Sequence, residues 1–156
     1  WLKGLSPKEN RDIPPLNYER VLELKKLMPN LNISINGGIK TLEHAKELLT
    51  QLDGVMIGRA AYENPWMLKE ADSLIYNTQD PIWKNRKELL TAYLPYVEQE
   101  LSQGCPLTII TRHLSSLFNG IPGSRKYRQM LSEQAPKAKD GVELLQKAMA
   151  FVEEIG

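Results

Sequence analysis

Cysteine is almost absent from this sequence, which contains one, Cys105, among 156 residues. A single cysteine forms no internal disulfide, and free thiols are typical of reducing compartments, so we expect a cytoplasmic protein. No apolar run approaches the roughly 18 residues of a membrane span, so we expect no membrane partner. The cysteine and the two histidines do not fall at metal-ligand spacing, so we expect no metal.

Glycine and proline, at ten residues each, are too few for a collagen-like or mucin-like chain. The net charge is only +1, while 42% hydrophobic and 25% charged residues are an ordinary globular composition. These values exclude a disordered chain and allow one domain or two small ones. The chain begins at Trp1 rather than at a methionine, and we expect it to be the C-terminal portion of a longer protein.

The first half of the sequence alternates between helical and strand-like segments. Residues 31–35 alternate apolar and polar side chains, and residues 54–58 form an apolar run typical of a buried parallel strand. Apolar side chains recur at helical spacing before the first strand, between the two strands and after the second strand, where the helical stretch covers 59–75. Asn17 and Thr41 are typical N-caps for the first two of these helices. This order predicts parallel βα units.

The second half of the sequence is helical throughout. A polar break predicts a linker over 77–83, which separates a domain over 1–76 from a domain over 84–156. The expected helices cover 84–103, 107–118, 124–133 and 137–154. Four helices joined by short connections predict a small helical bundle.

Glycine-containing loops follow both predicted strands, as Asn36-Gly37-Gly38-Ile39 and Gly58-Arg59. Glycine lets backbone N–H groups approach an anion, a helix N-terminus follows each loop, and Arg59 adds a fork of donors suited to phosphate. The alternatives are a plain tight turn at Gly37-Gly38 and a salt bridge at Arg59. The repetition of this pattern after two consecutive strands favours phosphate binding.

The standard phosphate site of a TIM (β/α)8 barrel lies in the loops after its seventh and eighth strands. The expected fold class is therefore α/β plus all-α. Residues 1–76 would contribute the C-terminal βα units of a barrel, and the helical bundle domain would follow.

Several uncommon motifs then carry a family resemblance. Asn36-Gly37-Gly38-Ile39 and residues 58–65 resemble the flavin-phosphate segments of tRNA-dihydrouridine synthases. Residues 1–11 resemble the A-type branch of that family, and residues 110–113 and 120–125 resemble its helical domain. The similarity spans nearly the whole chain, and the motifs occur in the same order as in the family.

The resemblance implies a flavin-dependent oxidoreductase that reduces uridines of the tRNA D-loop, of the U20/U20a type, to 5,6-dihydrouridine. FMN would supply the hydride and NADPH would reduce the flavin. The FMN phosphate would be held by Asn36, Gly37, Gly38, Gly58 and Arg59. The family's catalytic cysteine has no counterpart here, so the resemblance implies that this chain holds no catalytic residue and is inactive alone.

Basic residues gather where carboxylates are absent. No Asp or Glu occurs between Glu100 and Glu133, yet this interval holds Arg125 and Arg128, whose spacing places them on one helix face. The resemblance implies that both contact tRNA. The alternative is an ordinary solvated basic face.

The resemblance adds Lys8 and Arg11 as tRNA contacts; alternatively, these two side chains pair with neighbouring carboxylates. Tyr127 is expected in the core rather than stacked on a base, and His113 fits either an RNA contact or a helix cap. We interpret Cys105 as an incidental small residue, because no basic residue lies within five positions to lower its pKa.

Two other functions remain open at this stage. One is an FMN-dependent barrel oxidoreductase that acts on a small molecule, and the other is a non-catalytic RNA-binding module. Because the two strands would lack most of their barrel neighbours, we also expect self-association of the isolated chain.

Overall fold

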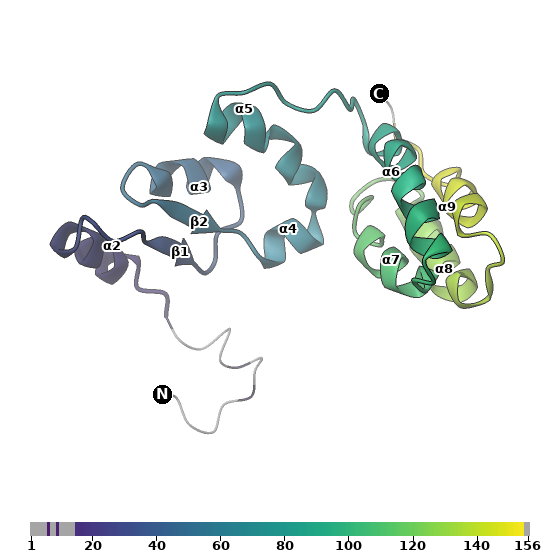
Figure 1. Ribbon diagram of the computed structural model, residues 1–156, viewed down its shortest axis with the longest axis horizontal. Helices are drawn as coiled ribbons and strands as arrows, with labels where there is room; N and C mark the ends of the chain where they lie inside the picture. The colour runs from purple at the N-terminus through teal and green to yellow at the C-terminus, as the bar shows by residue number, and fades with distance from the viewer. Residues whose placement is uncertain (1–5, 7–8, 10–14, 155–156) are drawn as a thin grey trace. The chain divides into compact units, whose positions relative to one another are not determined.

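The computed structural model describes Ser6, Glu9 and residues 15–154 (Figure 1). Its elements are, in chain order, α2 (Tyr18–Leu27), β1 (Ser34–Asn36), α3 (Leu42–Leu49), β2 (Gly54–Met56), α4 (Arg59–Glu63), the 3₁₀ segment η1 (Pro65–Glu70), α5 (Ala71–Tyr76), α6 (Arg86–Ser102), α7 (Leu107–Leu114), α8 (Ser124–Gln134), the 3₁₀ segment η2 (Ala135–Lys137) and α9 (Gly141–Met149). The expected order of helices and strands is confirmed.

The residues group into two compact units, of which one ends at Gly58 and the other begins at Arg59. In the first unit β1 and β2 pair in parallel, with Ser34 opposite Gly54 and Asn36 opposite Met56. The N-caps are those expected, since Asn17 Oδ1 accepts a hydrogen bond from Arg20 N–H and Thr41 Oγ1 accepts one from His44 N–H. The parallel βα arrangement is therefore confirmed for this pair of strands.

Strand β1 begins three residues later than expected, at Ser34 rather than residue 31. Ahead of it, Lys25 Nζ donates to the Leu31 carbonyl at 2.8 Å, and Ile33 N–H donates to the Asp53 carboxylate at 2.8 Å. Lys25 and Asp53 also form an ion pair at 2.7 Å. Side chains thus occupy backbone groups that a longer strand would use for pairing.

Strand β2 ends at Met56 and is less buried than its apolar sequence predicts. Val55 is only partly buried and Met56 is 50% exposed, whereas Ile35 of β1 is 2% exposed. Within the described residues the sheet has two strands, so β2 has a neighbour on one edge only. The expectation of a fully buried strand was wrong for β2. Edge pairing does not explain the difference, because β1 also has a single neighbour among the described residues and still buries Ile35.

Residues 59–76 group with the helical part of the chain, ahead of the predicted linker at 77–83. Trp66 explains part of this grouping, because the Arg86 guanidinium lies over its ring at 5.2 Å from the centroid. Within the predicted linker, Asn77 adopts a left-handed backbone with φ 54°, and the Asp80 carboxylate accepts hydrogen bonds from Ser73. The linker at 77–83 and the domain bounds on either side of it stay predictions.

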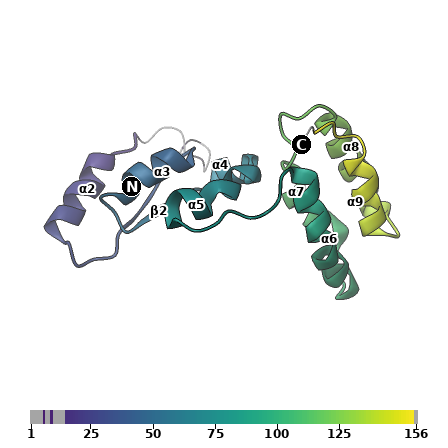
Figure 2. The same cartoon turned by 90° about the horizontal axis from the view of Figure 1, so that it is seen from above.

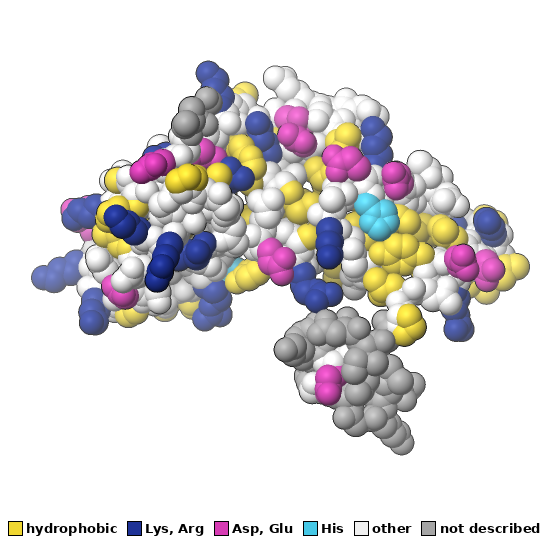
Figure 3. Space-filling view, turned by 180° about the vertical axis from the view of Figure 1, so that it is seen from behind, with side chains coloured by type: hydrophobic (Ala, Val, Ile, Leu, Met, Phe, Trp, Pro, Cys, Tyr) yellow, Lys and Arg dark blue, Asp and Glu magenta, His cyan; other side chains and the backbone are white. Residues whose placement is uncertain are grey.

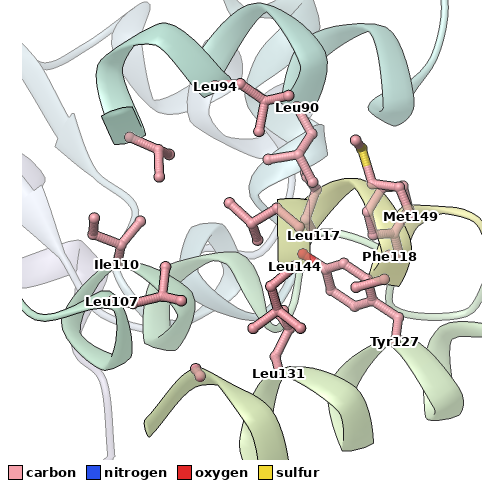
Figure 4. Packing of buried hydrophobic residues seen from close by; sticks show 14 of the residues in the cluster. Leu90, Leu94, Leu107, Ile110, Leu117, Phe118, Tyr127, Leu131, Leu144 and Met149 are labelled. Atoms are coloured by element: carbon pink, nitrogen blue, oxygen red, sulfur yellow. The ribbon is translucent and has the colours of Figure 1, made fainter. Parts of the chain in front are cut away.

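Helices α6 to α9 enclose one hydrophobic core. Helix α9 packs beside both α6 and α8 (Figure 2). Figure 4 shows core side chains that α6, α7, α8 and α9 all contribute, with the Phe118 and Tyr127 rings edge to face at 4.8 Å between centroids. Tyr127 is 0% exposed, which confirms its expected place in the core.

Two helices in this unit are shorter than expected. Helix α7 ends at Leu114 instead of residue 118, because Ser115 Oγ hydrogen-bonds the Arg112 carbonyl and tight turns follow. Helix α9 begins at Gly141 rather than residue 137, since the Asp140 carboxylate caps its N-terminus by accepting from Glu143 N–H. It ends at Met149 rather than residue 154, where Phe151 N–H and Val152 N–H donate to carbonyls three positions back, as in tight turns. Side chains near these ends compete with the helical hydrogen bonds that the apolar spacing suggested.

Candidate functional site

The loop after β1 has the backbone of an anion site. Asn36 is the last residue of β1, and Gly37 and Gly38 follow with φ of +123° and +65°. Side chains rarely tolerate such values, so glycine is required here. The loop then enters the eight-residue helix α3, whose N-terminus carries partial positive charge.

Two residues that the sequence analysis did not single out shape this loop. The Tyr18 hydroxyl donates a hydrogen bond to the Gly37 carbonyl, and the Leu16 side chain lies so close that a Cβ on Gly37 would come within 2.6 Å of it. The Gly37 carbonyl and the Gly38 N–H belong to one trans peptide and point in opposite directions. The Gly38 N–H therefore points away from Tyr18, and it has no hydrogen-bond acceptor within residues 15–154. An anion fits this arrangement.

The second loop leaves the same end of the sheet. Because Asn36 pairs with Met56 in parallel, the chain emerges toward Gly38 and toward Gly58 from the same strand end. Arg59 follows as the first residue of α4, which has only five residues. So short a helix supplies little of the expected dipole, and the charge of Arg59 is the stronger feature of this loop.

Helix α8 presents the predicted basic face. Arg125, Lys126 and Arg128 are exposed, whereas Tyr127 is fully buried and donates its hydroxyl to the Leu114 carbonyl at 3.2 Å. Burial raises the pKa of the Tyr127 phenol well above its usual value, so the hydroxyl stays protonated and donates. Figure 3 shows Lys and Arg side chains gathered over the unit that holds α8, while exposed hydrophobic side chains gather over the first unit.

A polar cluster joins α8 to α4. Ser116 Oγ donates to the Tyr62 carbonyl at 2.6 Å, and Asn119 Nδ2 donates to the Glu63 carbonyl at 2.8 Å. Asn119 Oδ1 in turn accepts from Arg128 Nη1 at 2.8 Å. Sequence reasoning missed Asn119, because its partners stand 56 and 9 positions away and no periodic pattern connects them.

Of the remaining residues that the sequence analysis discussed, some lie within the described residues and some outside them. Lys8 and Arg11 lie outside the described residues. His113 packs its ring edge to face against Tyr62, at 5.9 Å between centroids. Cys105 is half-buried against the core, in keeping with a packing role.

Within residues 15–154, no helix is long and apolar enough to cross a membrane. Nor do three or more His, Cys, Asp or Glu residues of that same stretch gather as a metal site would require.

Comparison with known proteins finds similarity along nearly the whole chain. The sequence model described as dihydrouridine synthase (Dus) matches residues 2–154. The chain belongs to the dihydrouridine synthase family. The resemblance to the A-type branch, noted from the motifs, agrees with the name tRNA-dihydrouridine(20/20a) synthase that similar proteins carry. A tRNA-dihydrouridine(20/20a) synthase of Yersinia pestis is 53% identical over 152 residues, which cover 97% of this chain and 44% of that protein.

Other dihydrouridine synthases show the same relationship. The proteins of that name from Vibrio vulnificus (strain CMCP6) and Vibrio cholerae are 50% and 48% identical, over 97% and 100% of this chain. They are covered over 46% and 48% of their own lengths. The chain therefore spans about half the length of the curated dihydrouridine synthases that it matches.

Proposed function

We propose that this chain is the C-terminal part of an oxidoreductase that reduces uridines of the U20/U20a type in tRNA to 5,6-dihydrouridine. The observation that carries the proposal is the identity of about half of all residues to tRNA-dihydrouridine(20/20a) synthases, sustained over nearly the entire chain. The partner is tRNA, the cofactor FMN and the reductant NADPH.

The loops after β1 and β2 would hold the FMN phosphate. Asn36, Gly37 and Gly38 would supply backbone N–H groups and a polar side chain, and Gly58 and Arg59 would supply a close backbone approach and a positive charge. The direction of the Gly38 N–H, which the Tyr18 hydrogen bond to Gly37 determines, supports this assignment. When bound, FMN supplies the hydride chemistry, and these residues orient it.

The basic face of α8 would bind the tRNA backbone. Arg125 and Arg128 are exposed, lie three positions apart on one helix, and have no carboxylate between residues 101 and 132 to neutralise them. Arginine favours phosphate because its guanidinium forms paired hydrogen bonds. Lys8 and Arg11 complete the proposed tRNA contacts.

Each part of the chain would have its own role in the proposed enzyme. Residues 1–76 would supply the last two βα units of a TIM barrel, residues 77–83 the linker, and residues 84–156 the helical tRNA-binding domain. The catalytic cysteine would lie in a part of the protein outside this chain, so the chain alone would be inactive. We place the enzyme in the cytoplasm.

The test uses the complete protein that contains this chain. We expect the purified protein to carry FMN and, with NADPH, to form dihydrouridine at positions 20 and 20a of an unmodified tRNA transcript. Arg59→Ala should lower FMN retention, whereas Arg20→Ala, which removes an exposed arginine outside both loops, should not. A colourless protein that binds tRNA without forming dihydrouridine would indicate an RNA-binding module. Flavin-dependent turnover of a small molecule, without action on tRNA, would indicate the other alternative.

A further inference from the structure

Helix α4 ends against the turn that connects α7 to α8. The last carbonyls of a helix have no partner within the helix. In α4 two of them, those of Tyr62 and Glu63, accept hydrogen bonds from Ser116 Oγ at 2.6 Å and Asn119 Nδ2 at 2.8 Å. These two side chains therefore cap the helix that begins directly after Gly58.

Asn119 differs from Ser116 because it makes a second contact. Its Oδ1 accepts from Arg128 Nη1 at 2.8 Å, so both ends of the amide are engaged. The partners also determine how the amide is oriented, since a carbonyl requires the NH₂ end and a guanidinium requires the oxygen end. A flipped amide would oppose donor to donor and acceptor to acceptor.

This contact restrains the Arg128 side chain without using it up. A guanidinium has five N–H donors, and one of them is engaged with Asn119. Arg128 is exposed, so its other donors are accessible to a ligand. Arg125 offers a comparison on the same helix, because it is exposed and makes no hydrogen bond or ion pair with any residue of the 15–154 stretch.

We propose that Asn119 is a positioning residue that holds the Arg128 guanidinium in place for a tRNA phosphate and, through the Glu63 carbonyl, ties it to α4. The proposal rests on the tRNA contact of Arg128 in the proposed function. Ordering a long side chain in advance removes part of the entropy lost on binding. Asn119 thus improves tRNA affinity without necessarily touching RNA.

The experiment measures tRNA affinity of the complete, flavin-loaded protein over a series of salt concentrations. We expect Asn119→Ala to weaken binding of an unmodified tRNA transcript roughly two- to tenfold, the size expected from ordering one long side chain. The dependence on salt should stay unchanged, because no charge is lost. Arg128→Ala should instead lower the salt slope by about one. Ser116→Ala removes the other side-chain cap of α4, does not contact Arg128, and should leave the affinity unchanged.

Double-mutant cycles separate positioning from general stability. Asn119→Ala should have no further effect on affinity once Arg128→Ala is present, and its full effect in the Arg125→Ala background. Equal effects in both backgrounds, or a matching loss with Ser116→Ala, would overturn the proposal in favour of a structural role. If Asn119→Ala does not fold, Asn119→Ser enters the same cycles, and equal effects in both backgrounds overturn the proposal there too.

The tRNA contact and its positioning can fail separately. An Arg128→Ala protein that binds tRNA normally would overturn both. Weakened binding in Arg128→Ala with normal binding in Asn119→Ala would overturn only the positioning role. Dihydrouridine formation by the unmutated protein tests the proposed activity independently of either variant.

Discussion

Gly123 offers a sharp test of how the helical unit is packed. It precedes α8 with a left-handed backbone, φ +84°, and a Cβ at this position would lie 1.7 Å from the Phe151 carbonyl oxygen. The obstacle is backbone, which cannot rotate away as a side chain can. Nearby, Glu153 N–H donates to the Pro122 carbonyl at 3.0 Å, so any displacement of residues 151–153 also disturbs that bond.

The expected loss of stability in Gly123→Ala has two parts. A left-handed backbone costs a residue with a Cβ about 1–2 kcal/mol. Forcing the C-terminal segment to shift costs about 1–3 kcal/mol more, as for other overpacked sites. The free energy of unfolding should therefore fall by about 2–5 kcal/mol.

Gly120 provides the matched control, because its φ is +81° and no atom lies within 4 Å of a Cβ built there. Gly120→Ala should lose only the conformational part, about 1–2 kcal/mol. Urea denaturation, followed by circular dichroism, measures both variants. Equal losses would refute the packing argument, since the two positions have nearly equal φ and differ in their surroundings.

Two further predictions concern charges. The Glu154 carboxylate accepts a hydrogen bond from the Arg86 backbone N–H at 2.8 Å and pairs with the Arg86 guanidinium at 2.6 Å, and the side chains of Glu154 and Arg86 are only 8% and 14% exposed. Glu154→Ala should lower the free energy of unfolding, measured by urea denaturation, by about 3 kcal/mol, because Arg86 is left charged and largely buried. Glu154→Gln should lower it less. The hydrogen bond from Ile33 and then Lys25 hold the pKa of Asp53 below its usual 3.8, so its stabilisation is present above that pH and is lost as the pH falls through the lowered value. The stability difference between the unmutated protein and Asp53→Asn, measured by denaturation at several pH values, should be full at neutral pH and shrink in acid; a difference independent of pH would contradict the pairing.

Most of the local structure follows from short stretches of sequence. Asn17 and Thr41 cap the helices that their side chains predict, and two βα units in succession require parallel strands. The positive φ of Gly37 and Gly38 likewise occurs where a glycine-containing loop was expected after the strand. These features depend on a few consecutive residues, so local physical chemistry determines them wherever the rest of the chain lies.

Other features depend on residues that meet only when the chain folds. Lys25 and Asp53 determine where β1 begins, and Trp66 and Arg86 draw residues 59–76 toward the helical unit. Asn119 acquires its place between Glu63 and Arg128 in the same way. Hydrogen bonds and ion pairs of this kind require correct distance and direction, and across long sequence separations only the tertiary structure provides both.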